Sequence, residues 1–110
     1  MDIPHVTKSS LLRQPHFMRL NLMHTELSSM LSKLHSYLCE PCTSEMYDQY
    51  LELNHKGILL KQTIDKVSQT AKNQIKFSKH TLDDIDSIGK KYDTFQKSLT
   101  VYLNEAIIHH

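Results

Sequence analysis

Apolar residues recur from residue 44 to residue 110 at alternating steps of four and three positions. A 3.5-residue repeat is typical of a helix that packs against other helices along one face. No proline interrupts the repeat, so we predict one long helix over residues 44–110, which at 1.5 Å per residue would be about 100 Å long. We call this repeat the heptad stripe. Its positions are Met46, Tyr50, Leu53, Gly57, Leu60, Ile64, Val67, Ala71, Gln74, Ser78, Thr81, Ile85, Ile88, Tyr92, Phe95, Leu99, Tyr102 and Ala106.

A shorter stripe of the same kind precedes the long helix. It predicts an amphipathic helix of about 23 residues, or about 35 Å, that begins near Pro15, because the first turn of a helix does not use the N–H that proline lacks. The helix should end within Cys39–Cys42, since Pro41 disfavours helical geometry in the residue before it. Thr43 or Ser44 can then cap the long helix, and so short a connection predicts an antiparallel hairpin. The shorter stripe consists of Leu20, Met23, Leu27, Met30, Leu34 and Tyr37.

One region of the long helix also fits a different arrangement. Gln74, Ser78 and Thr81 are polar residues at stripe positions, and the sequence from Thr81 to Asp84 resembles the capping box of a new helix. A break near Ser78 would give three helices of similar length in a self-contained bundle. We favour continuity, because the stripe resumes in phase at Ile85 and no glycine or proline marks a turn.

The predicted hairpin leaves much of the heptad stripe uncovered, since the first helix reaches only about a third of the length of the second. A buried Leu or Ile contributes roughly 1.5–3 kcal/mol relative to exposure, so a bare stripe should associate with other helices. The expected fold is all-α: a flexible arm over residues 1–14 and a helical hairpin with a long coiled-coil helix over 15–110, packed in a multi-chain helical bundle. The expected partners are other helical subunits, bound through Leu60, Ile64, Val67, Ile85, Ile88, Tyr92, Phe95 and Leu99.

Composition narrows the class of protein. The chain has 110 residues, enough for one domain, and 39% hydrophobic residues with no tryptophan are normal for elongated helices. The formal net charge of +1 is spread without a basic stripe or block, which argues against nucleic-acid and membrane-surface binding. No apolar run is long enough to span a bilayer, and residues 1–14 lack the apolar region of a signal peptide. We expect a cytoplasmic protein whose two cysteines stay reduced.

Cys39-x-x-Cys42 is the one motif with a chemical character, and His35 one turn earlier adds a third potential zinc ligand. A structural zinc site needs a fourth ligand, usually from a second pair at defined spacing, and no second pair exists. The eight histidines are scattered, without a nucleophile in a recognisable arrangement, and two separate glycines cannot form a phosphate loop. We therefore expect no enzyme activity, cofactor, metal or small-molecule substrate, with the zinc site as an alternative hypothesis.

Gln74 lies near the middle of the heptad stripe, between Tyr50 and Tyr102. This layout resembles a SNARE motif with a central glutamine layer, although Ser78 and Thr81 are polar where that family prefers apolar layers. A polar residue in one coiled-coil layer also fixes register or the number of partners. SNARE-type assembly is thus an alternative to a general scaffold.

Two blocks of sequence are separated by a short linker: Met30-Leu31-Ser32-Lys33-Leu34-His35-Ser36-Tyr37-Leu38 and Thr43-Ser44-Glu45-Met46-Tyr47. With the pair Leu53-Asn54, they resemble the second-subunit family of the biogenesis of lysosome-related organelles complex over residues 20–67. The linker here is shorter by a couple of residues. The resemblance implies a non-enzymatic scaffold subunit of an elongated hetero-oligomer, shared with the lysosome-positioning complex BORC. It also implies a role in endosome and lysosome trafficking, with only indirect membrane contact.

Overall fold

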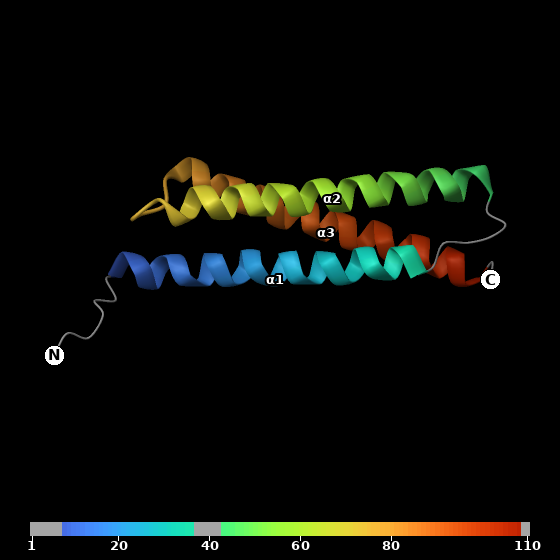
Figure 1. Ribbon diagram of the computed structural model, residues 1–110, viewed down its shortest axis with the longest axis horizontal. Coiled ribbons are helices and arrows are strands. Elements are labelled where there is room, and N and C mark those ends of the chain that lie inside the picture. The colour runs from blue at the N-terminus through green and yellow to red at the C-terminus, as the bar shows by residue number, and fades with distance from the viewer. Residues whose placement is uncertain (1–7, 37–42, 109–110) are drawn as a thin grey trace.

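The chain folds into three helices of nearly equal length. The computed structural model describes residues 8–36 and 43–108. Helix α1 spans Lys8–Ser36, α2 spans Ser44–Lys72 and α3 spans Lys79–Ile108 (Figure 1). These residues contain no strand, so the all-α class predicted from the sequence is confirmed for the described part of the chain.

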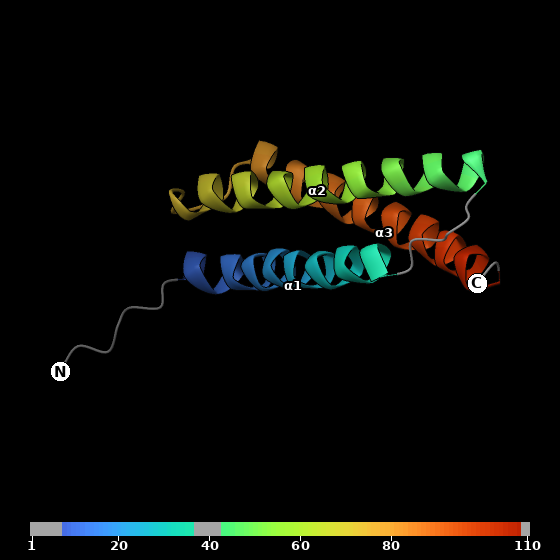
Figure 2. The same ribbon diagram turned by 45° about the vertical axis from the view of Figure 1, so that its right-hand side comes forward.

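The three helices run up, down and up in a bundle with principal extents of 64 × 29 × 17 Å. In Figure 1, α1 and α2 lie side by side and antiparallel, and α3 crosses behind them; Figure 2 shows the same arrangement from another side. Helix α3 packs most extensively on α2 and least on α1. The predicted antiparallel hairpin is therefore present in α1 and α2, and a third helix closes its open face.

The predicted continuous helix over residues 44–110 is wrong, because α2 ends at Lys72 and α3 begins at Lys79. The alternative arrangement, with a break near Ser78, is the one that the structure has. The break divides the heptad stripe into two halves that fold back on one another, so that each half covers the other. The stripe is therefore buried without a partner chain, so a multi-chain bundle is not needed to cover it.

The polar residues at stripe positions form the turn between α2 and α3. Gln74 Oε1 accepts hydrogen bonds from the Ser78 N–H and the Thr81 hydroxyl, both at 3.1 Å. The Ser78 hydroxyl accepts from the Thr81 N–H at 3.2 Å, the contact that an N-cap residue makes with the third residue of its helix. Ser78 therefore caps α3, three residues before the cap that the sequence suggests. These bonds satisfy helix-end groups that a continuous helix would pair within its own ladder.

Helix α1 begins at Lys8, so the predicted helix start near Pro15 is wrong, and only residues 1–7 of the predicted arm lie outside the described residues. Pro15 sits inside the helix and removes one intrahelical hydrogen bond, since it has no N–H. The helix beyond it is held against the α2–α3 turn, because His16 and Phe17 pack on Phe77 with ring centroids 5.7 and 5.4 Å apart. This packing anchors α1 at the same end of the bundle as the turn.

The core is one continuous cluster that draws on all three helices. Its α2 and α3 members are the apolar positions of the heptad stripe, so the stripe correctly predicted which face of each helix is buried. At the start of α2, the Thr43 hydroxyl accepts a hydrogen bond from the Met46 N–H at 3.2 Å, as an N-cap residue does. From α1 the cluster takes Leu20, Met23, Leu27, Leu31 and Leu34.

Polar side chains join the helices around this core. His24 Nε2 lies 3.1 Å from Asp65 Oδ1, and His35 Nε2 lies 2.7 Å from Asn54 Oδ1, so two histidines connect α1 to α2. The Tyr92 hydroxyl of α3 donates a hydrogen bond to the carboxylate of Glu26 on α1. Helix α1 is thus tied to both other helices by polar contacts as well as by the core.

Gly57 lies where side chains of α1 and α3 both meet α2. A Cβ at this position would lie 2.6 Å from Leu31 Cδ2 and 3.0 Å from Phe95 Cζ. Overpacking a core costs about 1–3 kcal/mol, whereas alanine gains about 1 kcal/mol over glycine in helix propensity. We expect Gly57→Ala to lower the free energy of unfolding by about 1 kcal/mol, measured by urea denaturation.

Gly89 offers the matched comparison on α3. A Cβ there would meet only the guanidinium of Arg19, 2.1 Å from Nη2, and the Arg19 side chain is 48% exposed and free to swing away. We expect Gly89→Ala to raise the free energy of unfolding by about 0.5–1 kcal/mol through helix propensity. Changes of the same sign in the two variants would contradict this account of the packing at Gly57.

Candidate docking groove between α2 and α3

The residues predicted to bind partners lie in the core of the chain itself. Seven of them are between 1% and 8% exposed, and Val67 is partly buried against the same cluster. The expectation that they form a bare surface is wrong, because the break between α2 and α3 lets the two halves of the stripe cover each other. The seven are Leu60, Ile64, Ile85, Ile88, Tyr92, Phe95 and Leu99.

A groove on the surface runs along the line where α2 and α3 meet. It consists of three adjoining hollows with volumes of about 410, 380 and 290 Å³. The first hollow shares Thr63 and Lys91 with the second, and Leu53, Lys56 and Ser98 with the third, so the three are continuous. Along α2 the lining runs from residue 49 to residue 70, which at 1.5 Å per residue is about 32 Å.

Apolar residues along the floor of the groove recur every seven positions on both helices. Four of the predicted binding residues reach it from below: Leu60 and Phe95 line the first hollow, and Val67 and Ile88 line the second. Leu53 and Tyr102 extend these two rows by one step each, on α2 and α3. The remaining predicted residues, Ile64, Ile85, Tyr92 and Leu99, belong to the core and do not line the groove.

Two exposed apolar side chains border this floor. Leu59 is 52% exposed and lines the first hollow, and Val101 is 58% exposed and lines the third. Both lie off the heptad stripe, which is why a search for stripe residues missed them. The signal that could have found them is an apolar residue at a position that the stripe leaves to solvent.

Lysines dominate the charge along the groove. Lys56 pairs with Glu52 at 2.7 Å, and this hydrogen bond and the nearby positive charge hold the pKa of Glu52 below its usual range. Lys66, Lys90 and Lys91 also line the groove and form no ion pair with any other described residue. The remaining carboxylate of the lining, Asp84, lies 3.5 Å from His80. The groove therefore has a net positive character.

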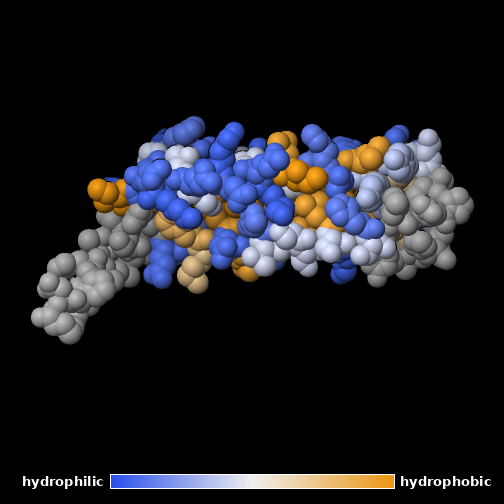
Figure 3. Space-filling view, in the orientation of Figure 1, coloured by the Kyte–Doolittle hydropathy of each residue, from blue (hydrophilic) through white to orange (hydrophobic). Residues whose placement is uncertain are grey.

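A second set of exposed apolar residues lies elsewhere on α2. Tyr47, Leu51 and Ile58 are 42–48% exposed and line none of the three hollows. Figure 3 shows apolar patches scattered among hydrophilic side chains on the face where α1 and α2 lie in front. Polar side chains interrupt these patches, whereas the three hollows between α2 and α3 adjoin one another.

The structure brings no metal centre together among residues 8–36 and 43–108, where no three His, Cys, Asp or Glu side chains converge. Cys39 and Cys42 lie outside the described residues, so the zinc hypothesis stays a prediction. The third potential ligand, His35, is hydrogen-bonded to Asn54 Oδ1. None of the helices in the described part has the length and hydrophobicity that a bilayer crossing requires.

The glutamine predicted to form a central SNARE layer has another role. A SNARE layer needs Gln74 in the middle of a continuous helix, but Gln74 follows the end of α2 and bonds to Ser78 and Thr81 across the turn. The expected position of Gln74 within one continuous helix is therefore wrong, and SNARE-type assembly itself stays a prediction.

Comparisons with known proteins identified no relative of this chain. Scans against protein-family models, curated proteins and solved structures found no match for this chain. The resemblance of residues 20–67 to the lysosome-related subunit family thus stays a prediction.

Proposed function

We propose that this chain is a non-enzymatic adaptor that joins other helical proteins in a hetero-oligomeric complex. The observation that carries the proposal is the continuous groove between α2 and α3, about 32 Å long with an apolar floor and two exposed apolar residues at its edge. Apolar grooves of helical proteins bind the apolar face of a further helix. A partner helix would thus be added as a fourth member to a bundle that is already folded.

The cellular setting that we propose is the biogenesis or positioning of endosomes and lysosome-related organelles. Its support is the resemblance of residues 20–67, which extend from α1 through the connection into α2. In this setting the chain is cytoplasmic and reaches the organelle through its partners. Imaging of the fluorescently tagged chain tests this part: signal on lysosomes or endosomes would support it, and a purely diffuse signal would contradict it.

The adaptor function predicts a specific pattern of co-purification. The tagged full chain, purified from eukaryotic cells that produce it, should recover helical subunits in stoichiometric amounts. Leu59→Glu places a charge at the edge of the apolar floor and should reduce this recovery at least about tenfold, since each 1.4 kcal/mol of lost affinity is a factor of ten. Recovery is measured by quantitative mass spectrometry.

Ile58→Glu is the matched control, because Ile58 precedes Leu59, is similarly exposed at 42%, and lies outside the groove. Both variants should keep the helical circular dichroism of the parent chain, since both side chains face solvent. Equal recovery with the two variants would contradict a docking role for the groove. A chain that stays monomeric with no stoichiometric partner would contradict the adaptor function itself.

A further inference from the structure

We infer that the helix bound between α2 and α3 is amphipathic and carries acidic residues on both sides of its apolar face. This inference rests on the proposed function and names the chemistry of the partner. It follows from the spacing of the groove floor, from the charge along its edges and from the charge of the chain's own helices.

The spacing of the floor matches a heptad helix. Leu53, Leu60 and Val67 follow one another at seven-residue intervals on α2, and α3 presents a second row with the same interval. A helix whose apolar residues repeat every 3.5 positions keeps its face along such a pair of rows over its full length. A groove of about 32 Å accommodates about 21 residues of this helix. The second row consists of Ile88, Phe95 and Tyr102.

The charge along the edges selects acidic flanks. Lys66 lies on the α2 side and Lys90 and Lys91 on the α3 side, so a bound helix would pass between cations. Glutamates beside the apolar face of that helix, at the positions next to the seam of a coiled coil, would face these ammonium groups. Lysines at the same positions would be repelled, so the groove discriminates between partners by charge as well as by shape.

A second copy of the chain does not offer this complement through α1. Helix α1 exposes Met18 and Leu22, at 65% and 58%, but its sequence contains four lysine or arginine residues and one acidic residue, Glu26. The net charge of its sequence is thus positive, like that of the edges of the groove. A different protein is therefore the occupant that the charges favour, and self-association is a competing outcome of the test.

The test uses two synthetic peptides of about 21 residues with leucine at both core positions of each heptad. One peptide carries glutamate at the flanking positions and the other carries lysine. We expect the full chain to bind the glutamate peptide at least about tenfold more tightly, measured by fluorescence anisotropy, and to lose most of this preference at high salt. Equal affinity for the two peptides, or no binding of either, would overturn the inference.

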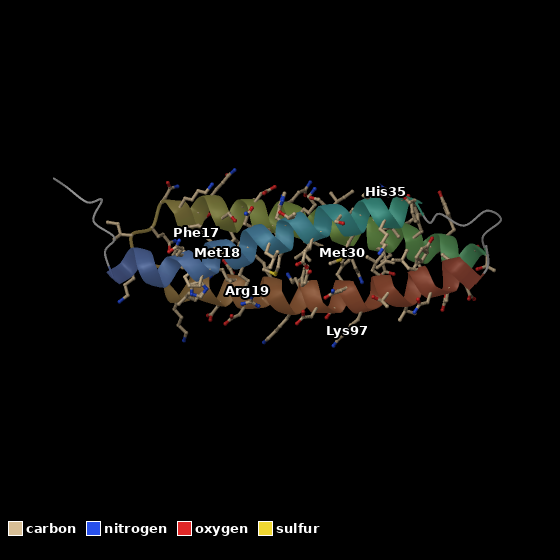
Figure 4. The ribbon with its side chains drawn as sticks, turned by 90° about the horizontal axis from the view of Figure 1, so that it is seen from below. Phe17, Met18, Arg19, Met30, His35 and Lys97 are labelled. Carbon is tan, nitrogen blue, oxygen red and sulfur yellow. The ribbon has the colours of Figure 1, made fainter. Side chains whose placement is uncertain are left out.

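Charge reversal on the protein locates the site. Lys90→Glu combined with Lys91→Glu should invert the preference, so that the lysine peptide binds more tightly. Lys97→Glu is the control, because Lys97 lies on the same helix, is exposed, and projects away from the other two helices in Figure 4. An unchanged preference in the double variant, or inversion by Lys97→Glu, would also overturn the inference. Circular dichroism confirms that each variant is folded.

The results separate this inference from the proposed function. If cellular partners are lost with Leu59→Glu but are unaffected by Lys90→Glu with Lys91→Glu, the adaptor function stands and the acidic helix is wrong. If no partner is recovered at all, the adaptor function fails. If sedimentation shows a dimer that Leu59→Glu dissociates and that excludes both peptides, the occupant is a second copy, and the inference is overturned.

Discussion

Replacing Ile88 and Phe95 together by aspartate is expected to unfold the chain in the absence of any partner. The two side chains are 1% and 4% exposed and belong to the shared core of the three helices. Truncation of a buried phenylalanine alone costs about 3–5 kcal/mol, and an unpaired carboxylate without water costs several kcal/mol more. The combined loss of free energy approaches or exceeds the stability of a folded domain, which is roughly 5–15 kcal/mol.

The measurement is the helical circular dichroism of the purified variant together with its thermal melt. A control with Gln96→Asp and Val101→Asp adds the same two charges at exposed positions of α3 and should stay folded. A folded monomer of the core variant would contradict the burial of the stripe within one chain. This expectation also means that loss of partners by the core variant would report unfolding, so partner binding has to be tested at Leu59.

Leu27→Ala is expected to lower the free energy of unfolding by about 2–5 kcal/mol, the second largest effect. Leu27 is fully buried on α1 and belongs to the core cluster that the three helices share. Its truncation removes transfer free energy and leaves a cavity that rigid neighbouring helices cannot close. Urea denaturation measures the change, and two-state behaviour of the parent chain is the condition for its use.

Leu22→Ala on the same helix is the control, because Leu22 is 58% exposed. We expect its effect to stay within about 0.5 kcal/mol, as for most surface substitutions. If Leu27→Ala were equally mild, α1 would contribute little to the stability of the bundle, and the core would consist of α2 and α3 alone. A large effect of Leu27→Ala establishes that α1 unfolds together with the other two helices.

The turn between α2 and α3 shows why the predicted architecture failed while the predicted faces were right. The stripe resumes in phase at Ile85, which favours one helix, but two antiparallel helices that bury the same face keep that phase equally well. Glycine and proline are common signals of a turn, yet here Gln74, Ser78 and Thr81 end one helix and begin the next through their own hydrogen bonds. The sequence feature that indicated the turn was therefore a succession of polar residues at core positions.

Only part of the candidate site could be predicted from the sequence. Four residues predicted to contact a partner do line the groove, but they form its floor and not an exposed surface. They are Leu60, Val67, Ile88 and Phe95. The exposed residues at the edge, such as Leu59, follow no period in the sequence. They border a groove only because α3 lies beside α2. The sequence likewise does not reveal which lysines flank a groove, because Lys66 and Lys91 are far apart along the chain and yet line the same hollow.

The sequence by itself determined the all-α class, the buried face of each helix and a cap at Thr43 or Ser44, because these follow from side-chain spacing and from bonds within a few residues. Whether the stripe serves one chain or several was decided by the tertiary structure. The reason is that a buried apolar side chain is stabilised equally by any apolar neighbour, so its pattern states that it must be covered but not by which helix. That choice belongs to the six-residue turn after Lys72, which folds α3 back onto α2 and creates the groove between them.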